Sequence, residues 1–107
     1  MLPKKNRMNK KGIDLIFKEG KSVFSPNLTF KFLITKLLVP RISFIAPKAV
    51  AKLAVKRNLL RRCGYSALKK HISRFPLGIT GVFIFKKYQD DISVIENEIK
   101  NILDKIN

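Results

Sequence analysis

The chain has 107 residues, with 23 lysines and arginines against 7 aspartates and glutamates, a formal net charge of +16. Apolar residues make up 46% of it, too many for a disordered basic tail, and the length suits one core. No apolar run approaches the roughly 20 residues that span a bilayer. A lone Cys63 excludes an internal disulfide. We therefore expect one domain, residues 1–107, in the cytoplasm.

The charge is unevenly distributed along the chain. Five of the seven acids lie in the last eighteen residues, so the first 89 residues hold 21 bases against Asp14 and Glu19 alone. A field of this sign and size favours a polyanionic partner, of which nucleic acid is the main candidate.

Residues 1–8 read as a basic N-terminal arm. Asn9 is a suitable cap for a short helix that reaches about Lys18, and Gly20 is suited to ending it. Ile13 and Phe17 are four residues apart and therefore share one face of this helix.

Two strands are predicted next. Residues 28–34 alternate, with Leu28, Phe30, Phe32 and Ile34 on the face expected to be buried. Residues 41–46 form a second strand between two prolines, and we expect the two strands to pair antiparallel. A further short strand at residues 21–24 is an open alternative.

A long helix is predicted over residues 53–72, after a loop of residues 48–52. Its apolar sector contains Leu53, Leu60, Cys63, Gly64, Ala67 and His71, and its far side contains Asn58, Arg62, Tyr65 and Lys69. Lys56 phases with the apolar sector, so it either extends outward or precedes the helix. Close packing against the sheet would explain Gly64, which costs a helix about 1 kcal/mol.

Residues 79–85 are almost wholly apolar, which is typical of a central strand covered on both faces. A helix precedes it, so it should run parallel to the strand before that helix. Residues 91–106 carry isoleucines at helical spacing. The order α-β-β-α-β-α indicates an α+β fold, a small sheet packed with helices.

Catalysis by the protein itself is not expected. The acids gather on one helix, where solvated charge explains them, and no Gly-rich phosphate loop or zinc spacing is present. His71 and Cys63 are eight residues apart, about 12 Å along one helix, out of hydrogen-bonding reach. Core packing is the favoured interpretation of both.

Binding is the remaining interpretation. Six cations between residues 48 and 62 have no acid near them in the sequence, and Asn58 adds a directional donor and acceptor. These cations are Lys48, Lys52, Lys56, Arg57, Arg61 and Arg62. The scattered lysines, such as Lys86 and Lys100, are interpreted as solvated. For Phe30 and Phe32 core packing is favoured over base stacking, and for Phe17 both remain open.

These residues resemble a known family, the protein subunit of bacterial ribonuclease P. The resemblance covers most of the chain: the opening LPKKNRM, FKEG at residues 17–20, SPNL at 25–28, Lys48-Ala49-Val50 in the loop, and RNLLRR at 57–62. Leu77-Gly78 before an apolar strand and an amphipathic last helix complete the order.

The resemblance implies a compact α/β sandwich with a mixed sheet and a left-handed crossover. It implies an accessory subunit of a holoenzyme in which RNA, with its own Mg²⁺, removes the 5′ leader of precursor tRNA. No protein-bound cofactor, membrane or obligate protein partner is expected. The RNA subunit would contact Lys48, Lys52, Lys56, Arg57, Asn58, Arg61 and Arg62; the leader would contact Ile13, Phe17 and Lys31.

The chain departs from the family pattern at four positions. Leu59 replaces an arginine and Tyr65 a basic residue, so two phosphate contacts are missing. Lys31 stands where an aromatic residue is frequent, and Ile13 where phenylalanine is common. Charge would then take a larger share of leader binding. The alternatives are a general RNA-binding or ribosome-associated protein and, disfavoured by the buried strand, a membrane-surface or DNA-coating protein.

Overall fold

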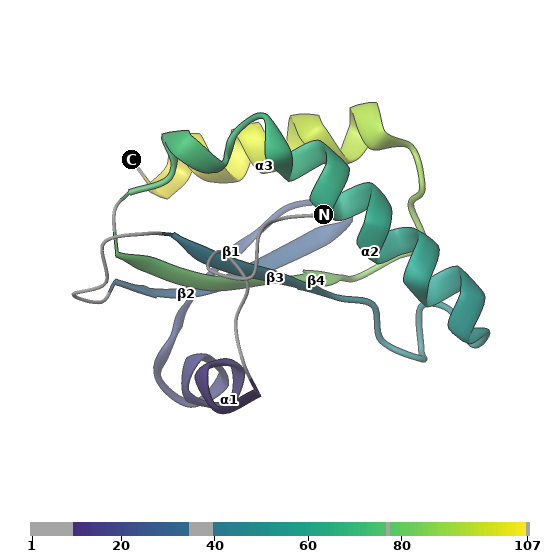
Figure 1. The fold of residues 1–107 in the computed structure, drawn as a ribbon, viewed down its shortest axis with the longest axis horizontal. Coiled ribbons are helices and arrows are strands. Elements are labelled where there is room, and N and C mark those ends of the chain that lie inside the picture. The colour runs from purple at the N-terminus through teal and green to yellow at the C-terminus, as the bar shows by residue number, and fades with distance from the viewer. Residues whose placement is uncertain (1–9, 35–39, 77, 107) are drawn as a thin grey trace.

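The fold is a four-stranded sheet with one helix on one face and two on the other (Figure 1). The computed structural model describes residues 10–34, 40–76 and 78–106, and for residues 10–14 it describes the backbone alone. The predicted arm at residues 1–8 and the Asn9 cap lie outside the described residues. The elements, in chain order, are α1 (Lys10–Glu19), β1 (Lys21–Phe24), β2 (Leu28–Ile34), β3 (Arg41–Ile45), α2 (Ala54–Lys69), a single 3₁₀ turn (Ile72–Arg74), β4 (Ile79–Phe85) and α3 (Ile92–Ile106). The α+β class is confirmed, and the short strand at residues 21–24 is present as β1.

The sheet is mixed, with the strand order β1-β2-β4-β3. β4 runs antiparallel to β2 and parallel to β3, as expected for a strand that follows a helical connection. The prediction that β2 and β3 pair is wrong, because β4 lies between them. β4 is buried along nearly its whole length, because it lies inside the sheet with α1 on one face and the main core on the other. β2 and β3 each leave more than one residue partly exposed.

The main core lies between the sheet and the pair α2 and α3. α2 packs over β3 and α3 over β1, while α1 covers β2 and β4 from the opposite side. Phenylalanine rings from three strands stack through this core: the Phe30 and Phe83 centroids are 4.3 Å apart, and those of Phe44 and Phe83 are 5.0 Å apart. Core packing of Phe30 and Phe32 is therefore confirmed.

Alternation in β2 is only partly observed. Leu28, Phe30 and Phe32 are buried as predicted, but Ile34 is exposed at the end of the strand. Thr29, assigned to the other face, is also buried, since α1 covers that face.

α2 begins one residue later than predicted. Leu53 has an extended backbone and precedes the helix, so its side chain is 63% exposed instead of packed. Its carbonyl oxygen accepts the first helical bonds, from the amides of Lys56 and Arg57 at 3.1 Å. Lys56 therefore lies inside the helix and is exposed. The helix ends at Lys69, and His71 follows it in a turn.

Tyr65 is buried, which contradicts its predicted place on the far side of α2. Its ring meets Phe44 edge-on at 5.1 Å, and its hydroxyl oxygen accepts a hydrogen bond of 3.2 Å from the Phe44 amide. β3 is an edge strand with amides that β4 does not pair, and the tyrosine hydroxyl satisfies one of them. Tyr65, which stands where the family pattern has a basic residue, is thus part of the packing.

Gly64 faces the same ring. A methyl group at this position would lie 2.5–2.8 Å from three carbons of Phe44, which confirms close packing as the reason for glycine. Phe44 cannot withdraw, because Tyr65 and Phe83 contact it from other sides.

We expect Gly64→Ala to destabilise the fold by about 1–2 kcal/mol, since overpacking outweighs the ~1 kcal/mol gained in helix propensity. Urea unfolding measures this change. Ser66→Ala, at an exposed position of the same helix, is the control and should leave stability equal or slightly higher. A Gly64→Ala protein as stable as wild type would contradict the packing described.

Glu98 corrects the prediction that the acids of the last helix are solvated. Its side chain points from α3 to the turn between β1 and β2 and is only 5% exposed. Its carboxylate accepts hydrogen bonds from Ser25 Oγ at 2.5 Å and from the amide and Nδ2 of Asn27, both at 2.7 Å. The Ser25-Pro26-Asn27 turn is therefore fastened to the opposite layer by one buried carboxylate.

Candidate nucleic-acid interface

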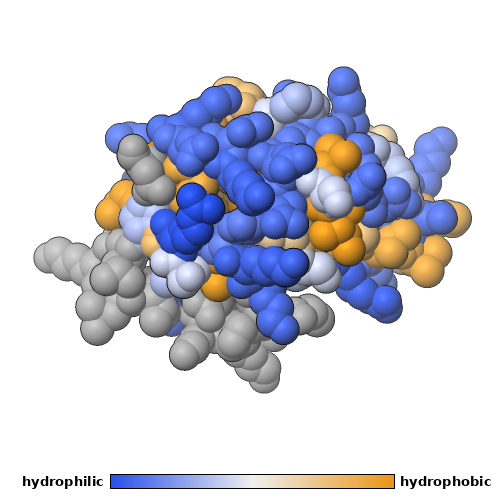
Figure 2. Space-filling view, turned by 90° about the horizontal axis from the view of Figure 1, so that it is seen from above, coloured by the Kyte–Doolittle hydropathy of each residue, from blue (hydrophilic) through white to orange (hydrophobic). Residues whose placement is uncertain are grey.

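The predicted RNA-binding residues gather on α2 and the loop before it. We call this set the basic face: Lys48, Lys52, Lys56, Arg57, Asn58, Arg61 and Arg62. All of them are exposed except Arg57, which is half-buried. Figure 2, which views the molecule from the side of α2 and α3, shows that hydrophilic side chains cover most of this side and that hydrophobic ones form separate patches. A regular helix thus carries most of the set in one geometry.

The basic face lacks carboxylate partners among the described residues. No lysine or arginine of this set forms an ion pair with an aspartate or glutamate there. Glu98, which could have neutralised a cation, is bound to the turn described above, and Glu96 is paired with His71 and Lys100. No described carboxylate therefore relieves the repulsion within the set, and an anionic ligand would relieve it.

Arg57 has a role that sequence reasoning missed. Its Nη1 donates hydrogen bonds to the carbonyl oxygens of Ala51, at 3.0 Å, and Lys52, at 2.7 Å. The guanidinium thereby ties the loop of residues 48–52 to the first turn of α2. No sequence pattern predicts such a bond, because every residue has a backbone carbonyl that could accept it. Arg57 holds the segment that carries Lys48 and Lys52.

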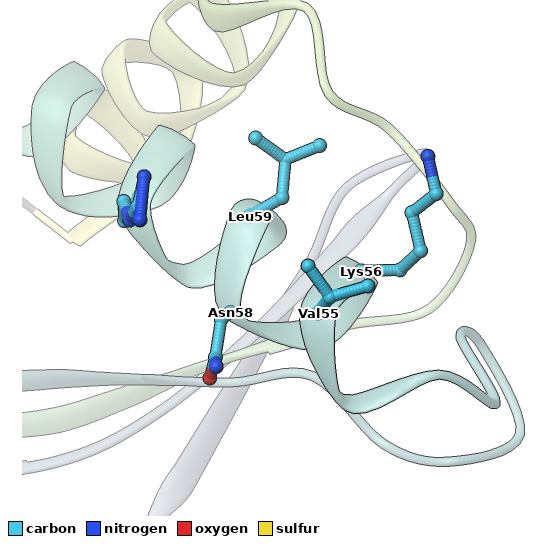
Figure 3. Close-up of a pocket in the computed structure, with 5 residues that line it drawn as sticks. Val55, Lys56, Asn58 and Leu59 are labelled. Carbon is cyan, nitrogen blue, oxygen red and sulfur yellow. The ribbon is translucent and has the colours of Figure 1, made fainter.

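Arg61 and Arg62 extend from the next turn. Arg61 Nη2 donates a hydrogen bond to Asn58 Oδ1, so the two side chains are oriented together. Two shallow hollows flank this pair along α2, and Asn58 and Arg62 line both of them. One, of about 260 Å³, is completed by Val55, Lys56 and Leu59 (Figure 3). The other, of about 200 Å³, is completed by Arg61 and Tyr65. Guanidinium and amide groups around a concave surface suit phosphate and base edges.

Leu59, where the family pattern has arginine, is half-buried and packs against the core. In Figure 3 it leaves α2 in a different direction from Asn58. It therefore contributes apolar contact at the margin of the basic face, and it places no charge there.

A second candidate surface lies on the opposite side of the sheet, along α1. Phe17 is 44% exposed, so it is not packed in the core, and its stacking on bases stays a prediction; its neighbour Ile16 is fully buried. Lys31 projects from β2 toward α1 and places its Nζ over the Phe17 ring, 5.2 Å from the centroid. The structure thus brings two of the three predicted leader residues together. Ile13 is in the same helix, but its side chain lies outside the described residues.

The remaining reactive side chains have structural partners. Core packing of His71 and Cys63 is confirmed, since both are buried. His71 Nε2 lies 2.9 Å from Glu96 Oε1 and joins the end of α2 to α3; this hydrogen bond lowers the pKa of the Glu96 carboxyl. Cys63 Sγ contacts the Asp90 carbonyl oxygen at 3.5 Å, and burial raises the pKa of its thiol.

Metal-site and membrane-spanning features are both absent from the described residues. In that part of the chain no three histidine, cysteine, aspartate or glutamate residues are grouped as a metal site would require. None of its helices has the length and apolar character needed to cross a membrane.

Comparisons with known proteins agree with the fold. The ribonuclease P protein of Thermotoga maritima superposes with a TM-score of 0.83 at 23% identity, over 94% of this chain and 97% of that one. That of Staphylococcus aureus gives 0.82 at 21% identity, with 95% of each chain covered. A comparison with curated protein sequences gave no match.

Membership is decided by the family model, since identities this low show the fold alone. The model described as "Ribonuclease P" matches residues 2–107, nearly the whole chain. The chain therefore belongs to the ribonuclease P protein family.

Proposed function

We propose that this protein is the accessory subunit of a ribonuclease P holoenzyme and docks on the catalytic RNA through its basic face. The observation that carries this proposal is the unpaired charge of that face: six cations on a helix and loop with no carboxylate partner among the described residues. Family membership gives the charge a specific partner, the RNA subunit. Arg61 and Asn58, which are oriented together, and the neighbouring Arg62 supply the exposed donors.

The 5′ leader of precursor tRNA is the proposed ligand of the α1 side. Phe17, 44% exposed with a lysine over its ring, offers exposed aromatic surface and one positive charge, which suits an unpaired nucleotide. Binding at Phe17 and Lys31, with Ile13 beside them, would hold the leader while the RNA cleaves it. The result is a mature tRNA 5′ end.

Catalysis is assigned to the RNA subunit and the Mg²⁺ ions that it binds. The protein contributes affinity and positioning: it neutralises phosphates where the RNA and the leader come close, and so lowers the Mg²⁺ concentration that the reaction needs. We assign it no cofactor of its own, and a cytoplasmic location follows from that of its RNA partners.

The alternative is a general RNA-binding or ribosome-associated protein, for which charge alone would suffice. Competition binding separates the two. Labelled ribonuclease P RNA is bound to the protein at ~0.15 M salt and displaced with unlabelled ribonuclease P RNA or with a ribosomal RNA fragment of equal length. We expect the fragment to compete at least tenfold less well. Equal competition would favour the alternative.

A further inference from the structure

The eight phenylalanines divide into two groups. Six are buried in the main core: Phe30, Phe32, Phe44, Phe75, Phe83 and Phe85. The other two, Phe17 and Phe24, are 44% and 58% exposed. Each exposed ring has a lysine over it: Lys31 Nζ is 5.2 Å from the Phe17 centroid, and Lys86 Nζ is 5.7 Å from that of Phe24. Both exposed rings thus have the same lysine-covered arrangement.

The two rings also share one side of the sheet. Val23 packs against the main core and is paired with Phe30, so its neighbour Phe24 points to the opposite face, the α1 side. Phe24 is opposite Thr29, which lies two residues, or about 7 Å, from Lys31 along β2. The second ring therefore continues the surface that begins with Phe17 and Lys31.

Phe24 and Lys86 are held by hydrogen bonds. The Lys86 amide donates to Asn27 O at 2.8 Å, and its Nζ donates to Ser25 O at 3.3 Å. Lys105, from α3, donates to the carbonyl oxygen of Phe24 itself at 3.1 Å. The backbone that carries the ring is thus ordered before a flat ligand stacks on it, which lowers the ordering cost of binding.

We infer that Phe24 and Lys86 form a second stacking site for an unpaired nucleotide, separate from the site at Phe17 and Lys31. This inference rests on the proposed function, because it takes the ligand to be single-stranded RNA. Phe24 is 58% exposed with Lys86 over its ring, so aromatic surface remains for a base to stack on, while the ammonium groups of Lys86 and Lys105 attract the phosphates. An RNA leader is favoured over a protein partner because Lys86 lies over the ring, Lys105 binds the Phe24 carbonyl oxygen, and Glu98, which binds the adjacent turn, is buried.

The test is a mutant cycle on the reconstituted holoenzyme. Precursor tRNAs carrying one abasic nucleotide at successive leader positions are bound to holoenzymes with wild-type protein, Phe24→Leu or Phe17→Leu. Leucine keeps apolar bulk and removes the aromatic face. In wild type, abasic substitution should weaken binding by about 5-fold or more at two positions. Phe24→Leu should abolish that loss at one of them, and Phe17→Leu at the other.

Ile92→Ala is the control, because Ile92 is similarly exposed but lies on α3, on the other side of the sheet. Thermal unfolding confirms that each variant folds. An abasic profile for Phe24→Leu that superposes on wild type overturns the inference. So does a protein dimer that sediments in wild type and is absent in Phe24→Leu, since the ring would then bind a second copy. A wild-type holoenzyme insensitive to every abasic position would instead contradict the proposed leader binding as a whole.

Discussion

Glu98→Ala is expected to destabilise the protein by about 3 kcal/mol, the largest effect of any single polar substitution that we predict. The carboxylate accepts three hydrogen bonds from Ser25 and Asn27 in a nearly closed site. Its removal leaves the amide and Nδ2 of Asn27 without this acceptor, while Ser25 Oγ keeps the Leu28 carbonyl oxygen at 3.0 Å. Hydrogen bonds to a charged group contribute about 1.5–3 kcal/mol each. For a domain of this size, Tm should fall by roughly 10–20 °C.

Asp104→Ala is the matched control, because it removes the same charge from an exposed position of α3. It should change the free energy of unfolding by less than about 0.5 kcal/mol. Glu98→Gln should fall between the two, since the amide keeps one acceptor oxygen and turns an N–H toward the existing donors. Equal Tm values for Glu98→Ala and Asp104→Ala would mean that the turn does not depend on the carboxylate.

The second large effect concerns RNA affinity. Replacing Arg61 and Arg62 together by glutamine should weaken binding to ribonuclease P RNA about 10- to 100-fold at ~0.1 M monovalent salt. The plot of log affinity against log salt should also become shallower, by roughly 0.7–0.9 for each RNA phosphate that the variant no longer neutralises. Glutamine keeps length and polarity, so the change isolates the two charges.

Lys87→Gln with Lys100→Gln removes the same net charge from exposed positions outside α2 and serves as the control. If the basic face binds RNA at defined phosphates, the control should keep the wild-type slope. If net charge alone attracts RNA, both double variants should shift affinity and slope equally. The latter result would contradict docking through α2.

Much of the fold was predictable because the strongest patterns are local. The apolar run of β4 predicted a central strand, and isoleucines at helical spacing predicted α3. The pairing of strands was harder to predict. β2 and β3 are neighbours in the chain, but β4 is inserted between them, and this order depends on which strand gains most from burial on both faces. That is a property of the whole sheet, which no single segment contains.

The candidate interface shows the same limit at the level of side chains. Helical phasing correctly predicted that Asn58, Arg61 and Arg62 lie on an exposed face. It misplaced Tyr65, since an aromatic residue on the flank of a helix can turn inward when an edge strand offers an amide to bind. The hydrogen bonds of Arg57 and Glu98 likewise join segments that only the folded chain brings together.

Cleavage of precursor tRNA at low Mg²⁺ tests the central claim most directly. The purified protein is mixed with a bacterial ribonuclease P RNA, and release of the 5′ leader is followed with protein alone, RNA alone and both together. We predict little cleavage by either component and efficient formation of the mature 5′ end by the two combined. Absence of stimulation would contradict the role as a ribonuclease P subunit, and cleavage by the protein alone would contradict the assignment of catalysis to RNA.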